Sequence, residues 1–158
     1  MGRLGVGEPS TSVRLARTPD GRRLVVSRVV DADPARAWRL LCDAARWPEW
    51  SPSVRGVATS DRHVVAGTSG RLRLAGVPVA VPFRVDAVGD RRWTWRVAGV
   101  PATGHAVTDA GDGGARVAVE VPPLAAAYVP ACVVALRRFA RLVERPEDDD
   151  GGSETSVE

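Results

Sequence analysis

The chain has 158 residues, of which 44% are hydrophobic and 26% are charged, a composition typical of one soluble domain. Its longest apolar run, Leu124 to Leu136, is shorter than the roughly 20 residues that span a bilayer. The N-terminus lacks the apolar core of a signal peptide. We therefore expect a cytoplasmic protein without a transmembrane segment.

All 22 basic residues are arginine, and no lysine is present. The missing lysine excludes Schiff-base chemistry and a P-loop, and the overall bias is typical of a GC-rich bacterium. The last twelve residues hold six acids and no base. The rest of the chain therefore has 22 arginines and 13 acids, a net charge of +9. Because these arginines form no dense run, the sequence does not favour a nucleic-acid partner.

Residues 1–21 are rich in Gly, Ser, Thr and Pro, which predicts a flexible N-terminal arm that could include a short strand at Val13–Leu15. The turn signal at Pro19-Asp20-Gly21 ends this arm. From Arg22 to Val30 the content of β-branched residues rises. This segment is the first strand that we predict with a full hydrophobic pattern.

A helix is predicted over Pro34–Asp43. Asp33 is a suitable N-cap and Pro34 a suitable first helical residue. Helical spacing puts Ala37, Trp38, Leu41 and Cys42 on the face toward the core. The prolines in the following segment, 46–52, end this helix and leave room for one short helical turn that contains Trp47 and Trp50.

Further strands alternate with breaks that contain Gly or Asp. They are predicted near Val54–Thr59, Gly67–Ala75, Val79–Val88, Arg92–Ala98, Thr103–Asp109 and Arg116–Val121. Short breaks between such runs indicate antiparallel hairpins. A long helix follows over Pro123–Glu144, and Pro130 either kinks it or starts its regular part. The residues after it, 146–158, are expected to form a disordered acidic tail.

Several motifs resemble the opening signature of the START-like (SRPBCC) superfamily, and in particular its polyketide cyclase/dehydrase group. They are the strand Val26–Val30, the stretch Asp31-Ala32-Asp33-Pro34 up to Trp38, the pair Cys42-Asp43, and Trp47-Pro48-Glu49-Trp50-Ser51-Pro52. Later segments match in the same order: Gly67-Thr68, Arg92 to Arg96, Gly104-His105 and Gly113 to Val117. The resemblance covers Arg22–Glu144.

This resemblance implies an α+β helix-grip fold over residues 22–145. In that fold a curved, seven-stranded antiparallel sheet surrounds the long C-terminal helix, with two short helices after the first strand. A hydrophobic cavity lies between the sheet and the helix. The superfamily includes cyclases, lipid carriers, hormone receptors and chaperone activators, so the fold alone does not decide the function.

Strand periodicity identifies the side chains expected to line the cavity, because alternate residues share a face. The apolar face should point toward the helix, although the first two predicted strands leave the choice of face open. The expected ligand-binding residues are Leu72, Leu74, Val81, Phe83, Trp93, Trp95, His105, Val107, Val119 and Tyr128.

His105 and Tyr128 are the candidate catalytic residues. On a face otherwise lined by apolar side chains, His105 could transfer protons with a pKa near the operating pH. The alternative, which histidines in such positions more often follow, is a wall histidine with a satisfied hydrogen bond. Tyr128 could offer its hydroxyl to a ligand, or pack in the core with the hydroxyl at the rim. Asp109 could orient His105 or simply lie near the end of its strand.

No metal site or cofactor is predicted. The two histidines and two cysteines show no ligand spacing. Cys42 and Cys132 are expected to be buried free thiols, and His63, in a polar turn, to be exposed. Trp47 and Trp50 are expected to pack the short helical turn against the sheet, or else to line the cavity entrance.

Three functions remain open from the sequence. The first is binding of a small hydrophobic molecule, lipid or polyketide-like, in an internal cavity. The second is a true cyclase/dehydrase that promotes aldol cyclisation and loss of water. The third is a chaperone- or ribosome-associated interaction protein that uses its surface arginines. The oligomeric state is not predicted.

Overall fold

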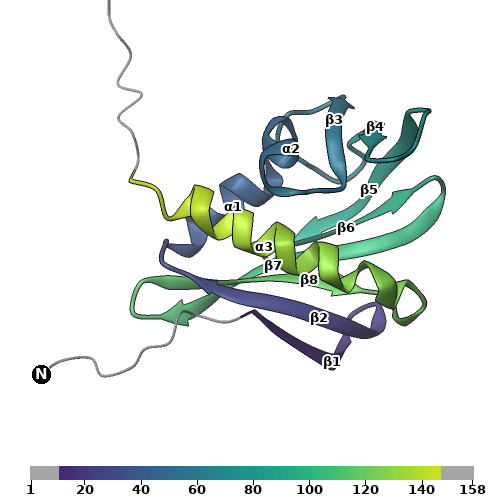
Figure 1. The fold of residues 1–158 in the computed structure, drawn as a ribbon. Coiled ribbons are helices and arrows are strands. Elements are labelled where there is room, and N and C mark those ends of the chain that lie inside the picture. Colours follow the sequence, from purple (N-terminus) through teal and green to yellow (C-terminus); the bar gives the residue numbers. More distant parts are fainter. Residues whose placement is uncertain (1–10, 147–158) are drawn as a thin grey trace, which may run out of the picture.

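A computed structural model describes residues 11–146. The first ten residues of the predicted arm and residues 147–158 of the predicted acidic tail lie outside the described residues. One antiparallel sheet of eight strands curves around a long C-terminal helix (Figure 1). Its strand order is β1-β2-β8-β7-β6-β5-β4-β3. This is the predicted α+β helix-grip fold.

The elements follow one another in the predicted order. The sheet consists of β1 (Ser12–Thr18), β2 (Gly21–Val30), β3 (Val54–Thr59), β4 (Ser69–Leu74), β5 (Val81–Gly89), β6 (Arg92–Val97), β7 (Val100–Gly111) and β8 (Gly114–Val121). The helical elements are α1 (Pro34–Cys42), the single turn η1 (Ala44–Arg46), α2 (Trp47–Trp50), η2 (Pro123–Tyr128) and α3 (Val129–Val143).

The sheet has one strand more than predicted, because residues 12–18 form β1. This strand pairs with β2 along its whole length, from Ser12 opposite Ser27 to Thr18 opposite Gly21. The tight turn depends on Gly21, whose φ of 102° suits glycine. Residues 12–18 are therefore not a flexible arm, and the short strand considered at Val13–Leu15 is the middle of a longer one. Val13 and Leu15 stay exposed in β1, so the strand lacks the buried face on which a hydrophobic pattern depends.

Helix α1 begins as predicted. The Asp33 carboxylate accepts a hydrogen bond from the Arg36 backbone N–H at 2.8 Å, and Pro34 starts the helix. The buried face is rotated relative to the prediction, since Leu40 is buried with Ala37, Leu41 and Cys42, whereas Trp38 is only partly buried. The packing of α1 against β7 and β8 sets this face.

The C-terminal helical region has two parts rather than one. Residues 123–128 form the 3₁₀ segment η2, which has a non-helical residue at Ala125 and no buried residue. Pro130 lies in the first turn of α3, where its missing N–H costs nothing. Pro123–Val143 is long and apolar enough to cross a membrane, but Leu136, Phe139 and Ala140 of α3 are buried in the core. Helix α3 is therefore the central helix of the folded domain.

An aromatic cluster fills the space between α2, the sheet and α3. The Trp47 ring stacks on Trp93 with 5.4 Å between centroids, and the Trp47 Nε1 donates to the Leu41 carbonyl at 3.1 Å. Trp50 meets Phe139 edge-on at 5.5 Å. Trp47 therefore packs against the sheet as predicted, whereas Trp50 packs on α3. This cluster forms the floor of the candidate site.

Candidate functional site

Two adjoining cavities lie between the sheet and α3. The outer cavity has a volume of about 580 Å³ and the inner cavity about 40 Å³. Val54, Trp95, Thr103 and Tyr128 line both of them, so the two spaces meet at these side chains. The outer wall is mainly apolar and comes from β4, β6, β7, η2 and α3, with Leu72, Val97 and Ala131 among its residues. The arrangement is an apolar chamber with a small chamber behind it.

Most of the predicted ligand-binding residues lie around these cavities. Leu72 and Leu74 line the outer one, Trp93, His105 and Val119 the inner one, and Trp95 and Tyr128 both. The inner face of β4 is thus the one that carries Leu72 and Leu74.

Three of the predicted residues line neither cavity. The Phe83 ring packs edge-on against Trp47 and Trp95, with centroids 5.8 and 5.7 Å away. Val107 is fully packed in the core, and Val81 is partly buried on β5. Of these three side chains, Phe83 contacts two of the rings that line the inner cavity.

His105 is the main polar group of the inner cavity. It is buried, and its ring stacks on Trp93 with 3.8 Å between centroids. Its Nε2 forms a hydrogen bond with the Thr103 hydroxyl at 3.0 Å, while Nδ1 makes no well-formed hydrogen bond.

Burial lowers the pKa of His105 to about 3, because the charged ring would lose its hydration. The backbone of Trp93 opposes this shift in pKa, and the charge of Arg92 adds to it. Of the two roles that the sequence left open for His105, this pKa does not fit proton transfer near neutral pH and fits the wall histidine. A neutral imidazole at this position can donate or accept a hydrogen bond, but it holds no proton to deliver at neutral pH.

Tyr128 stands where the two cavities meet. It lies at the end of η2 and lines both spaces. Burial of its hydroxyl raises the pKa of Tyr128, and the nearby Ser53 and Ser51 hydroxyls partly offset this rise in pKa. The hydroxyl is therefore neutral and placed next to two further hydroxyls. Together these groups form a small polar cluster beside an otherwise apolar chamber.

Other candidates from the sequence do not join the site. Asp109 accepts a hydrogen bond from the Gly111 N–H at 2.8 Å, at the β7–β8 turn, and does not orient His105. His63 is exposed, as predicted. Cys42 and Cys132 are buried free thiols, and burial raises the pKa of each to about 12. Within residues 11–146, no group of three or more His, Cys, Asp or Glu side chains could hold a metal ion.

The structure adds polar residues that the sequence did not indicate. Thr103 lies two residues before His105 on β7, so the period-two pattern could have identified it. Ser51 and Ser53 lie near Tyr128 although they are more than 70 residues away along the chain, and no local pattern reveals this proximity. The indole nitrogens of Trp50 and Trp93 are buried without a hydrogen-bond partner in the described part of the chain, although both side chains line the inner cavity.

Solved structures with the same fold extend over most of the chain. The ZhuI aromatase/cyclase from Streptomyces sp. R1128 is 13% identical, with a TM-score of 0.61, covering 85% of this chain and 95% of that one. Protein Ms6760 from Mycobacterium smegmatis is 17% identical, with a TM-score of 0.59 and coverages of 84% and 98%. A hypothetical protein, jhp0584, from Helicobacter pylori is 12% identical, with a TM-score of 0.60 and coverages of 75% and 86%. At these identities the likeness concerns the fold.

A family model gives the relationship directly. No relative was found among curated protein sequences. The model for polyketide cyclases/dehydrases and lipid-transport proteins, however, matches residues 21–144, which include all of β2 through α3. With the helix-grip sheet and its internal cavity, this match establishes that the chain belongs to the family of polyketide cyclases/dehydrases and lipid-transport proteins.

Proposed function

We propose that the chain binds a small, uncharged hydrophobic molecule, lipid-like or polyketide-like, in the two joined cavities. The observation that carries this proposal is the outer cavity of about 580 Å³, whose lining of Leu72, Val97 and Ala131 is apolar. This volume lies within the range of about 300–1,000 Å³ typical of small-molecule sites. Family membership agrees with a ligand of this kind.

The polar groups favour a neutral ligand with one hydrogen-bonding end. None of the residues that line the outer and inner cavities is Arg, Asp or Glu. A buried carboxylate or ammonium would lose its hydration there without a partner of opposite charge, at a high free-energy cost. His105, Thr103 and Tyr128 can hydrogen-bond a carbonyl or hydroxyl group instead. The apolar body of the ligand then fills the outer cavity.

An enzyme of the cyclase/dehydrase kind is the second candidate, and one observation favours it. The hydroxyls of Tyr128 and Ser53 and the neutral His105 lie around the point where the cavities meet, where they could stabilise an enolate oxygen. With its pKa near 3, His105 would act there as a hydrogen-bond donor. Catalysis would then come from folding a reactive chain in the cavity and from this donor.

Native mass spectrometry of the purified chain tests the binding function. We expect a bound apolar molecule, or uptake of long-chain alcohols and aromatic ketones from a panel that also contains matched carboxylates. Filling the outer cavity with Ala131→Phe should weaken uptake about tenfold or more. Ala127→Phe, at an exposed position of η2 that lines neither cavity, is the matched control and should bind like wild type.

Two results would count against the proposal. Equal binding by Ala131→Phe and wild type would place any ligand outside the outer cavity. Preference for the carboxylates would contradict the uncharged ligand. Conversion of a bound poly-β-ketone by wild type, lost in Tyr128→Phe, would favour the enzyme over simple binding.

A further inference from the structure

We propose that one end of the domain docks on the surface of an anionic lipid bilayer. This open end consists of η2, the β4–β5 loop (residues 75–80) and the β6–β7 turn (residues 98 and 99) with its flanks. Its apolar side chains would enter the headgroup region, while Arg55 and Arg73 face lipid phosphates. The inference concerns the outer surface and does not depend on the ligand proposed for the cavity.

The open end is apolar and uncharged over three separate segments. No Arg, Asp or Glu occurs in residues 74–83, 97–103 or 121–136. Two of these segments contain the same tetrapeptide, Ala-Gly-Val-Pro, at residues 75–78 and 98–101. In both copies the glycine has a positive φ, 77° at Gly76 and 76° at Gly99, which makes a tight turn that presents the following valine outward.

The apolar side chains at these turns are exposed. Val77 is 42% exposed, Val100 62%, and Leu124 of η2 is exposed completely. Val77, Val100 and Ala125 all line the outer cavity, so the three segments meet around its mouth. Figure 1 shows them together at the right-hand end of the molecule. A cluster of exposed apolar tips on a charged domain indicates an interaction surface.

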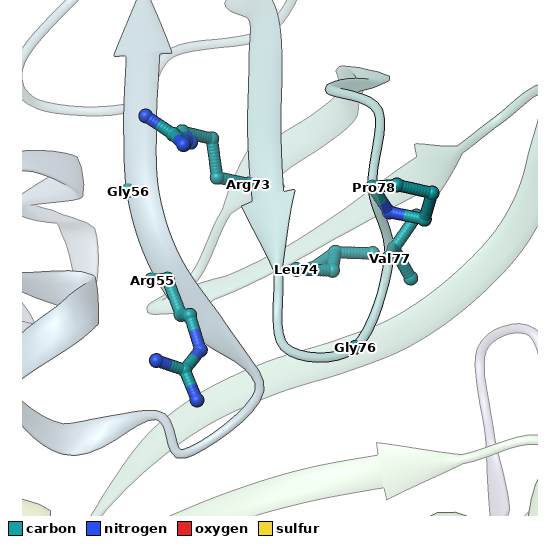
Figure 2. Close-up of a pocket in the computed structure, with 7 residues that line it drawn as sticks. All are labelled: Arg55, Gly56, Arg73, Leu74, Gly76, Val77 and Pro78. Carbon is teal, nitrogen blue, oxygen red and sulfur yellow. The ribbon is translucent and has the colours of Figure 1, made fainter.

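Two arginines flank this apolar surface. A hollow of about 630 Å³ is formed by Arg55, Arg73 and the Gly76–Pro78 turn (Figure 2). Both arginines are exposed, on the neighbouring strands β3 and β4. Neither makes an ion pair or side-chain hydrogen bond within residues 11–146. Guanidinium groups at this position are suited to the phosphate oxygens of lipid headgroups.

The net charge of the domain favours an anionic bilayer over a second copy of the chain as the partner that covers the open end. The described residues hold 21 arginines against 12 acids, a net charge of +9, and the open end contributes no acid. A second copy seated on the same tips would therefore leave Arg55 and Arg73 unmatched. An anionic bilayer supplies both an apolar layer for the valines and leucine and phosphates for the arginines.

Flotation of the full-length chain with lipid vesicles tests this surface. Wild type should bind vesicles of phosphatidylcholine with phosphatidylglycerol at low salt, and bind pure phosphatidylcholine vesicles much more weakly. Arg55→Glu with Arg73→Glu should weaken binding by well over tenfold, since each basic residue near such a surface contributes roughly a factor of five. Leu124→Asp should weaken it at least tenfold, and because Leu124 is fully exposed this variant should fold normally.

Matched controls come from the far edge of the sheet. Arg14 and Arg17 are exposed on β1, and their joint replacement by Glu changes the net charge equally. Leu15→Asp, also at an exposed apolar position, matches Leu124→Asp. Both controls should keep binding within about twofold of wild type.

Four outcomes would overturn the proposal. They are failure of wild type to bind anionic vesicles, equal binding to neutral vesicles, equal losses in the β1 controls, or a wild-type dimer in sedimentation that Leu124→Asp dissociates. Such a dimer would show that the open end binds a second copy of the chain. Because these measurements need no cavity ligand, their failure leaves the proposed binding function untouched.

Discussion

The two ends of α3 show how similar apolar sequences reach different states. At the packed end, where α1 and α2 cover the sheet and the C-terminal half of α3, Leu136, Phe139 and Val143 are buried almost completely. At the open end, η2 has no buried residue. The packed end has large buried rings and two covering helices, whereas the open end has mainly small apolar residues on turns and in η2, which no helix covers. An apolar sequence is therefore buried only where other elements cover it.

The largest contrast between the two ends should appear in stability. Phe139→Ala should lower the free energy of unfolding by about 3–5 kcal/mol, because it removes a buried ring that packs against Trp50. Leu124→Ser at the open end should change it by less than about 0.5 kcal/mol. Urea denaturation measures both. Similar losses in the two variants would mean that the open end is covered in solution.

The pH dependence of stability should report on His105 at the packed floor of the cavity. Its pKa falls from an ordinary value near 6.5 to about 3, so the unfolded chain binds a proton that the folded chain excludes. This contribution to stability is complete above pH 6.5 and is lost as the pH falls toward 3. Between pH 6.5 and 5 it amounts to about 2 kcal/mol, or about 1.4 kcal/mol per pH unit.

Denaturant titrations at pH 7 and pH 5 isolate this contribution. His105→Gln should lose less stability than wild type over that interval, because the variant lacks the imidazole that binds a proton only in the unfolded chain. His63→Gln, at an exposed position, should follow wild type. An identical pH slope in wild type and His105→Gln would show that the imidazole is hydrated in solution.

A smaller effect should distinguish two buried tryptophans of α2. The Nε1 of Trp47 donates to the Leu41 carbonyl, whereas the Nε1 of Trp50 has no partner in the described residues. Trp47→Phe leaves that carbonyl unpaired, and Trp50→Phe removes an unpaired donor. Trp47→Phe should therefore be about 1 kcal/mol more destabilising than Trp50→Phe, as measured by urea denaturation. Equal losses would indicate that a buried water satisfies Trp50.

Local signals in the sequence predicted most of the fold correctly. The Asp33-Pro34 start of α1 and the glycine-bounded hairpins each depend on a few neighbouring residues, and Pro130 marked the place where the C-terminal helix is either kinked or begins its regular part. Strand β1 was considered only as a short strand at Val13–Leu15, and its full length was not predicted, because its hydrophobic side chains are exposed and its pairing with β2 uses mainly the backbone. In α1, Leu40 is buried instead of Trp38 because of contacts with β7 and β8. The sequence of the nine-residue helix alone does not indicate these contacts.

The candidate site was only partly predictable. Periodicity placed Trp93, Trp95, His105 and Val119 on one face, and all four line the inner cavity. The pKa of His105 could not be predicted, because it depends on complete burial against Trp93. Neither could the hydroxyl cluster of Tyr128, Ser51 and Ser53, which joins residues more than 70 positions apart.

The tryptophans of the aromatic cluster allow binding in the inner cavity to be followed by fluorescence. Four of the five tryptophans line the inner cavity, and Trp38 lies outside it on α1. Their indole emission therefore comes largely from the walls that a guest molecule would touch, in a chain with a single tyrosine and two phenylalanines. Occupation of the inner cavity would displace solvent from these rings and shift the emission wavelength. The unlabelled protein thus contains its own fluorescent sensor for whatever it holds.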